Sequence, residues 1–235
     1  MRVVAIETAT ASSSVALGEG RNVVAAGMQQ DARGHVRFLV PALDFCFASV
    51  GWSPDQVDVV AVDVGPGRFS GIRVGLATAQ AIAGAVGAPL VPVSSLDAVA
   101  LQAATGHRRV WAVVDVRRGE IAVGPYQPVP GGVVRDGPTE IVTPDVFRGM
   151  LDSDRSEILV VGDWASVPAE TFSGLHAVKM GRPRYPEAGA VLEIAVARAE
   201  KGEFIHPDEI RPLYLREPDT RINWADYRTE GPWAS

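Results

Sequence analysis

The chain has 235 residues, and its formal net charge of −6 argues against a protein that holds nucleic acid by itself, because neutralised phosphates supply most of such affinity. Hydrophobic residues make up 47% and charged residues 21%, a globular balance that excludes a disordered chain. Cys46 is the single cysteine, so disulfides and thiolate metal clusters within one chain are excluded.

The N-terminal part of the chain predicts one complete α/β unit. Short apolar runs joined by short turns indicate an antiparallel meander of strands at 3–6, 14–17 and 23–28. Helices and buried strands then alternate, with helices at 35–50, 70–86 and 94–104 and strands at 57–64 and 89–93. The order βββαβαβα is that of the ribonuclease H-like half of actin-type and sugar-kinase-type folds.

The chain from Arg109 onward predicts a degenerate second copy of this unit. Its strands are expected at 110–114, 120–126, 133–135 and 157–161, and its helices at 143–151 and 188–201. We therefore expect an α/β fold of two ribonuclease H-like lobes with mixed sheets flanked by helices. The first lobe would span 1–106 and the second 107–206, with 207–222 packing back on the first lobe and 223–235 forming a flexible tail.

The glycine-rich turn from Asp63 to Gly71 is the strongest local feature. Gly65 and Gly67 permit unusual backbone angles between a buried strand and a helix, and amides at a helix N-terminus favour an anion. No phosphate-loop lysine follows, so a tight connection without a ligand competes with a binding site. The candidate nucleotide or anion residues around this turn are Glu7, Thr8, Thr10, Asp63, Gly65 and Gly67.

The two helices predicted at 35–50 and 70–86 are apolar on more than one face. In the second, a stripe with little side-chain bulk recurs every four residues and would let another helix approach closely, at Gly71, Gly75, Ala79 and Ala83. In the first, one apolar face is formed by Val36, Leu39, Val40, Leu43, Phe47 and Val50. Further apolar residues lie off that face, at Phe38, Ala42 and Phe45. Either a partner or a second layer of the same chain would cover these faces.

The residues indicate no catalytic centre and no metal site. The position one turn after His35 is Leu39, so that helix offers one possible metal ligand and no second. Cys46 lies inside an apolar helix, no Gly-x-Ser-x-Gly elbow occurs, and the strand-end acids Glu7, Asp63 and Asp115 can simply cap turns.

The sequence also predicts a cytoplasmic protein without a membrane segment. No apolar run approaches the roughly 20 residues that cross a bilayer. Glu7 comes too early for a secretory signal.

Several segments together resemble the TsaB (YeaZ) family. They are residues 6–10, 65–79, 93–96, 115–121 and 211–216, together with a helix that begins at His35 and reaches Pro41. The resemblance covers about residues 1–216, and the 65–79 motif is highly specific in combination. Two departures argue against a nucleotide or metal in this chain's own cleft, because Glu7 stands where the family usually has Asp and Arg68 where it usually has Ser.

The resemblance implies two actin-like (ASKHA) lobes and a role in forming N6-threonylcarbamoyladenosine next to the anticodon of tRNAs that read codons beginning with adenine. Members of the family are non-catalytic partners of the related TsaD subunit, which holds a metal through paired histidines, and a TsaE ATPase joins them. ATP and a metal would then be used by the partner subunits, with tRNA reached only through the complex.

The resemblance also favours an interface on the two apolar helices, formed with TsaD or with a second copy of the chain when TsaD is absent. The expected interface residues are His35, Phe38, Leu39, Ala42, Phe45, Gly71, Arg73, Gly75, Ala79 and Ala83. Two enzymatic alternatives stay open: an ATP-dependent small-molecule kinase of the same fold, which would need Glu7 or Asp63, and a metallo-glycopeptidase, which would need a metal pair.

Overall fold

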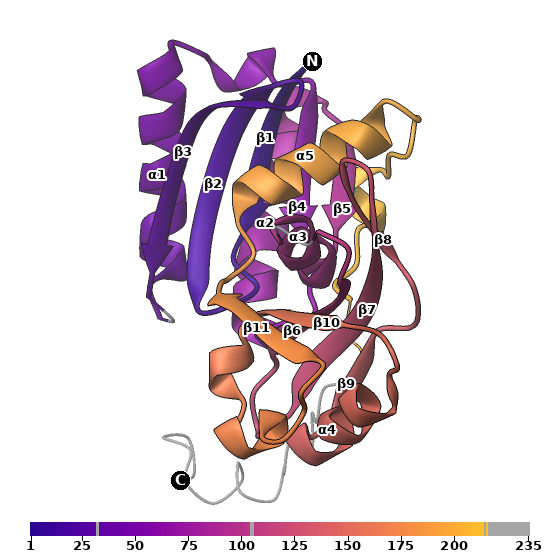
Figure 1. The fold of residues 1–235 in the computed structure, drawn as a ribbon. Coiled ribbons are helices and arrows are strands. Elements are labelled where there is room, and N and C mark those ends of the chain that lie inside the picture. Colours follow the sequence, from indigo (N-terminus) through magenta and orange to yellow (C-terminus); the bar gives the residue numbers. More distant parts are fainter. Residues whose placement is uncertain (32, 104–105, 214, 216–235) are drawn as a thin grey trace, which may run out of the picture.

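The first lobe is built on a five-stranded sheet of order β3-β2-β1-β4-β5 in the computed structural model, which describes residues 1–31, 33–103, 106–213 and 215 (Figure 1). The strands are β1 (Arg2–Glu7), β2 (Ser12–Glu19), β3 (Asn22–Gln30), β4 (Val59–Asp63) and β5 (Leu90–Val93). The meander β1–β3 is antiparallel, whereas β4 and β5 continue parallel to β1. The strand order is that of a ribonuclease H-like lobe, as the sequence predicts.

Helices cover both faces of this sheet (Figure 1). On one face lie α1 (His35–Val50) and α2 (Phe69–Val86), and on the other lie α3 (Ser95–Leu101) and α5 (Ala188–Ala199). Because successive side chains of a strand point to opposite faces, Val4 packs with α1 and α2, while Val3 and Ala5 pack with α5. Burial on both faces explains why β1 and β4 are continuous apolar runs.

The second lobe repeats the first sheet's order as β8-β7-β6-β10-β11. Its strands are β6 (Arg109–Asp115), β7 (Ile121–Val129), β8 (Gly132–Arg135), β9 (Glu140–Val142), β10 (Ile158–Gly162) and β11 (Val178–Pro183). The meander β6–β8 is antiparallel and β10 and β11 are parallel to β6, while β9 pairs with β7. Helix α4 (Pro144–Ser153) packs in this lobe's core, and short 3-10 turns connect β10 to β11.

The boundary expected between the lobes is wrong for α5. The range 107–206 places this helix in the second lobe, but its residues Val191, Leu192 and Ala195 share a core with the first sheet. Apolar residues around α5 indicate a buried helix, but they do not indicate which sheet buries it.

The segment after α5 also lies on the first lobe. Ile205 pairs with Leu90 of β5, Ile210 is buried in the core beside α2, and the amide of Leu213 donates to the carbonyl oxygen of Val64 at 2.8 Å. The expected tail 223–235, like residues 216–222, lies outside the described residues.

Candidate functional site

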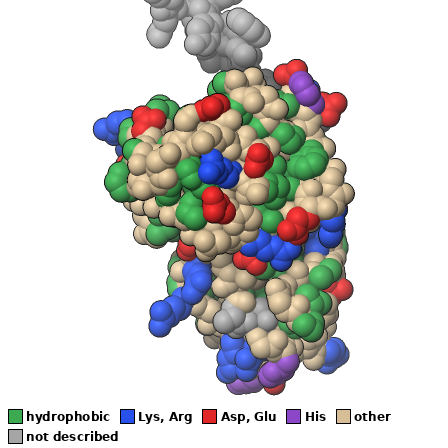
Figure 2. Space-filling view, turned by 90° about the horizontal axis from the view of Figure 1, so that it is seen from above, with side chains coloured by type: hydrophobic (Ala, Val, Ile, Leu, Met, Phe, Trp, Pro, Cys, Tyr) green, Lys and Arg blue, Asp and Glu red, His purple; other side chains and the backbone are tan. Residues whose placement is uncertain are grey.

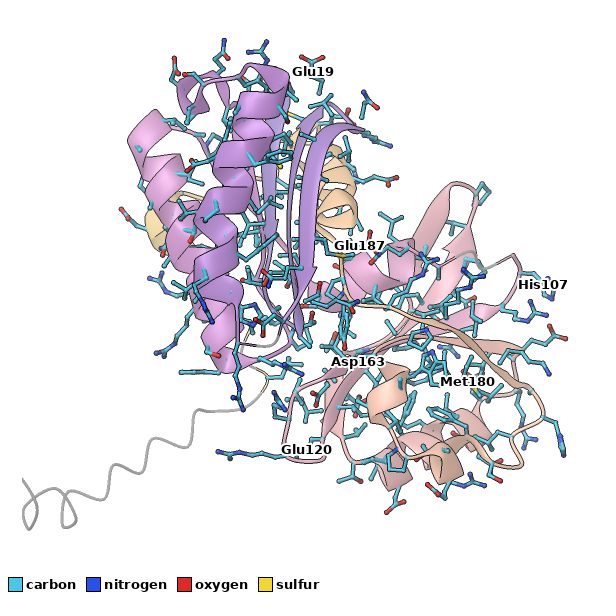
Figure 3. All side chains as sticks on the ribbon, turned by 90° about the vertical axis from the view of Figure 1, so that its left-hand side faces the viewer. Glu19, His107, Glu120, Asp163, Met180 and Glu187 are labelled. Atoms are coloured by element: carbon cyan, nitrogen blue, oxygen red, sulfur yellow. The ribbon has the colours of Figure 1, made fainter. Side chains whose placement is uncertain are left out.

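Acidic residues from both sheets meet where the lobes face each other. Glu7 and Asp63 follow a register pair of the parallel strands β1 and β4, so they are direct neighbours. Asp115 ends β6 and Asp163 follows β10 in the second lobe. Figure 3 shows Asp163 at the junction of the two lobes. The sequence singles out the first three of these acids, and the fold adds Asp163.

Glu7 and Asp63 form a buried pair of carboxyl groups, 0% and 1% exposed. Glu7 Oε1 accepts from the amide of Ala9 at 2.8 Å, and Asp63 Oδ1 accepts from the amide of Gly65 at 2.7 Å and from Ser95 Oγ at 2.6 Å. Burial raises the pKa of Asp63 to about 7, and burial together with the charge of Asp63 raises the pKa of Glu7 well above its usual range. Both shifts have the same cause, because two neighbouring carboxyl groups without water around them are costly to ionise together.

The glycine-rich turn packs directly on the β1–β2 turn. The amide of Arg68 donates to the carbonyl oxygen of Ala9 at 2.6 Å, and a Cβ on Gly67 would lie 2.1 Å from that same oxygen. Gly65 has a φ of +100°, a backbone conformation that favours glycine. The glycines thus permit backbone-to-backbone contact.

Three backbone amides near a possible anion already have partners within the chain. The amides of Ala9, Gly65 and Arg68 donate to oxygens of Glu7, Asp63 and Ala9, respectively. The candidates Thr8 and Thr10 are also engaged, because Thr8 Oγ1 donates to the carbonyl of Gly71 at 2.7 Å and Thr10 Oγ1 accepts from the amide of Ser12 at 3.3 Å. A phosphate that used these three amides and two hydroxyl groups would have to displace these bonds.

The side chain of Arg68 supplies a cation to the second lobe's acids. Its Nη2 lies 3.3 Å from Asp115 Oδ2, and the two side chains are 13% and 17% exposed. Burial and the charge of Asp115 together raise the pKa of Asp163 to about 6, against the opposing charges of Arg68 and Arg117. Arg68 therefore neutralises acids that face the first lobe.

The small-residue stripe of α2 faces inward, which corrects its prediction as a surface for another helix. Gly71, Gly75, Ala79 and Ala83 are all buried. A Cβ on Gly71 would lie 2.0 Å from the carbonyl oxygen of Thr8, and one on Gly75 would lie 2.5 Å from Thr8 Oγ1. The close approach that small residues permit is made by the end of β1, within the lobe.

The side of helix α1 that is buried also differs from the predicted apolar face. Leu39 is buried in the core, and His35 is buried with its Nδ1 2.5 Å from Ser13 Oγ. Val36 and Val40, which the spacing places on the same apolar face as Leu39, are 71% and 56% exposed. Phe38 and Ala42 are half-buried, next to Gly27 of β3.

Exposed apolar residues remain on the outer surface of both helices, which lie next to each other on one face of the first lobe (Figure 3). On α1, Val36, Val40 and Phe45 are exposed, and the helical turn places Phe45 on the opposite flank from the two valines. On α2 the exposed residues are Phe69, Ser70, Arg73, Ala77, Ala81, Gly84 and Ala85. We call the exposed residues of α1 and α2 the helical face. The sequence predicts an apolar surface on these two helices, but it assigns several of the residues to the wrong side.

Helix α2 also meets a length and composition criterion for a membrane span, with a mean hydropathy of 1.2 over 18 residues. One such helix is weak evidence, because core helices of globular proteins pass the same criterion. Its Ile72 and Leu76 pack in the first lobe's core.

Metal ligands and surface charges elsewhere point to no further site. Among the described residues, no group of three or more His, Cys, Asp and Glu side chains could hold a metal ion. On the face seen in Figure 2, acidic and basic side chains are interspersed with apolar ones.

Comparisons with known proteins agree with this architecture. Residues 29–137 match the family model for TsaD, tRNA N6-adenosine threonylcarbamoyltransferase. The chain is 30% identical to the tRNA threonylcarbamoyladenosine biosynthesis protein TsaB of Escherichia coli, covering 92% of this chain and 95% of that protein. It is 27% identical to the TsaB protein of Bacillus subtilis, over 96% and 99%.

A solved structure from Pseudomonas aeruginosa, described as similar to peptidase YEAZ, superposes with a TM-score of 0.81. The two chains are 26% identical, and the match covers 92% of this chain and 99% of that one.

Proposed function

This chain belongs to the TsaB (YeaZ) family of tRNA threonylcarbamoyladenosine biosynthesis proteins, and from this premise we propose that it is the non-catalytic scaffold subunit of the assembly that makes this modification. Its role is in the formation of N6-threonylcarbamoyladenosine in tRNA. The observation that carries the scaffold assignment is the helical face, whose apolar residues are exposed on two neighbouring helices.

The state of the cleft supports a non-catalytic role. Phosphoryl transfer needs free donors for phosphate oxygens and ionised acids for a metal. Here the amides of Gly65 and Arg68 donate within the chain, and burial raises the pKa of both Glu7 and Asp63, which disfavours their ionised forms. Neither a small-molecule kinase nor a metallo-glycopeptidase is favoured by these groups.

The helical face supports a TsaD-like partner. Exposed valines on α1 and small exposed residues on the neighbouring α2 suit helix-to-helix packing, in which apolar area is removed from water. The match to the TsaD family model spans α1 and α2, so the partner would present related helices. Two related pairs of helices can pack around one pseudo-twofold axis, and the same geometry lets two copies of this chain pair when TsaD is absent.

The remaining parts of the proposal concern the assembly. A TsaE-like ATPase joins the pair, the partner subunits use ATP and a metal, and this chain reaches tRNA only through the complex. The net charge of −6 supports that last point, because an acidic chain gains little from phosphate contacts. The assembly works in the cytoplasm.

A binding experiment tests the docking part of the proposal. Val40→Asp and Ala81→Arg place charges on the helical face, and Val146→Asp, on an exposed valine of α4 in the second lobe, is the matched control. Light scattering with and without the TsaD-like subunit should show a heterodimer for the wild type and for Val146→Asp. The two helical-face variants should stay monomeric. A wild-type chain that ignores the TsaD-like subunit would overturn the proposal.

A further inference from the structure

One charged contact between the lobes lies at the start of α2. Arg68 is the residue directly before that helix, and its Nη2 pairs with Asp115 Oδ2 at the end of β6. Asp115 is held in turn, because its Oδ1 accepts from the amide of Arg117 at 2.8 Å. With side chains 13% and 17% exposed, the pair is shielded from solvent and from salt. We call it the Arg68 tie.

The second contact centres on Asp97 in the first turn of α3. Asp97 Oδ1 accepts from Tyr126 Oη at 2.8 Å and from Arg135 Nη2 at 2.6 Å, both in the second lobe's sheet. Its Oδ2 accepts from Arg198 Nη2 at 3.0 Å, in α5 on the first lobe. Arg198 also donates to the carbonyl oxygen of Pro92 in β5 at 2.5 Å. One carboxylate thus joins both lobes, and we call this the Asp97 tie.

The two ties approach the junction from opposite faces of the first sheet. Arg68 leads into α2, which covers one face, while Asp97 lies on α3 and Arg198 on α5, which cover the other. A hinge opening that keeps one tie closed would therefore stretch the other.

Helix α3 fills the space between the ties. Its Ala98 packs in the first lobe's core with α5, whereas Leu96, Val99 and Ala100 pack against β6 and β7 of the second lobe. The amide of Ser95 also donates to the carbonyl of Gly65 at 3.0 Å. The helix cannot follow one lobe without disturbing its packing on the other.

We propose that the Arg68 and Asp97 ties hold the two lobes at one fixed angle, so that the chain does not open and close about its cleft. The fixed angle is a property of this chain alone and does not depend on the proposed partner. Its consequence for a partner does rest on the proposed function: a subunit docked on the helical face always meets the second lobe in the same orientation.

Spin labels on opposite lobes measure this angle directly. Glu19 in the first lobe and Met180 in the second are exposed and lie well apart in Figure 3, and each is replaced by cysteine in a Cys46→Ala background. Double electron–electron resonance spectroscopy on the purified, doubly spin-labelled chain should give one narrow distribution of the distance between the two labels. Two distances, or one broad distance distribution, in this chain with both ties intact would by itself overturn the proposal.

Variants then test whether the ties are the cause. Arg68→Met and Asp97→Asn remove the charges with little change of shape, and the two together should broaden the distribution or add a second distance. Glu200→Gln is the control, because it breaks the exposed Arg21–Glu200 pair within the first lobe, and it should leave the distribution unchanged. A doubly substituted chain with the narrow distribution of the tie-intact chain would overturn the proposal. If the double variant does not fold, each single variant is measured, and both retaining the narrow distribution would likewise overturn it.

Discussion

A matched pair of glycine substitutions in α2 separates the inward stripe from the outer surface of the same helix. Gly84 is exposed, and a Cβ added there would have nothing within 4 Å, so Gly84→Ala should stabilise the fold by up to about 1 kcal/mol through helix propensity. Gly71 is buried, and its Cβ would lie 2.0 Å from the carbonyl oxygen of Thr8, a backbone atom.

The cost at Gly71 follows from that distance. Ordinary contact begins at 3.4 Å, so the backbones of α2 and the β1–β2 turn must separate by about 1.4 Å. The separation also weakens the hydrogen bond from Thr8 Oγ1 to the carbonyl of Gly71. Overpacking and a strained buried hydrogen bond together should exceed the propensity gain and leave a net loss of about 3 kcal/mol.

Urea unfolding followed by circular dichroism measures both substitutions. The midpoint should fall clearly for Gly71→Ala and rise slightly for Gly84→Ala, at an unchanged slope. If Gly71→Ala were as stable as Gly84→Ala, the stripe would face open space, and the inward packing described above would be refuted.

Three further predictions address the cleft and the second core. Burial raises the folded-state pKa of Asp63 from 3.8 to about 7, so between these pH values the folded chain binds more protons than the unfolded chain. The free energy of unfolding should therefore fall as the pH rises from 3.8 to about 7. Asp63→Asn should flatten a plot of urea midpoint against pH, and an equally steep plot would contradict this. Arg68→Met should raise the pKa of Asp163 above about 6, as measured by carboxyl carbon NMR, and an unchanged value would show that Arg68 does not act on it. Phe147→Ala should cost about 3–5 kcal/mol because this ring is fully buried, edge-to-face with Trp111 and Phe172, whereas Val146→Ala beside it should change stability by no more than about 0.5 kcal/mol. Equal urea midpoints for these two variants would be inconsistent with the core described here.

The element order could be predicted because each segment carries its own period. Helix α1 runs from His35 to Val50, as its apolar spacing predicts, and the β-branched run before the glycine-rich turn is a central strand. The short β9 and the edge strand β11 are not predicted by the sequence pattern. In β11 a glycine, a proline and exposed polar residues obscure the apolar alternation that normally identifies a strand.

The orientation of the helices could not be predicted from the same pattern. An apolar residue on α1 can face the core or a partner, and spacing alone does not distinguish Leu39, which is buried, from Val40, which is exposed. The stripe on α2 posed the same problem, because small residues permit close approach by a strand as well as by a helix. Only the position of Thr8 against Gly71 decides between them.

The cleft depends on contacts between distant parts of the sequence. Glu7 and Asp63 could be paired because neighbouring parallel strands end together. Arg68 and Asp115 are 47 residues apart, and nothing local indicates that they meet. The same holds for Asp97 and Arg198, which are 101 residues apart and belong to helices placed in different predicted lobes.

Reconstitution of the tRNA modification tests the scaffold function most directly. The TsaD-like and TsaE-like subunits, the enzyme that supplies threonylcarbamoyl-adenylate and an unmodified tRNA are combined with or without this chain, and N6-threonylcarbamoyladenosine is quantified by nucleoside mass spectrometry. We predict that the product forms only with the chain present, is lost with Ala81→Arg, and is retained with Val146→Asp and with Asp63→Asn. Full modification without the chain would contradict a non-catalytic scaffold. So would loss of the modification with an Asp63→Asn chain that is still folded and still binds the TsaD-like subunit.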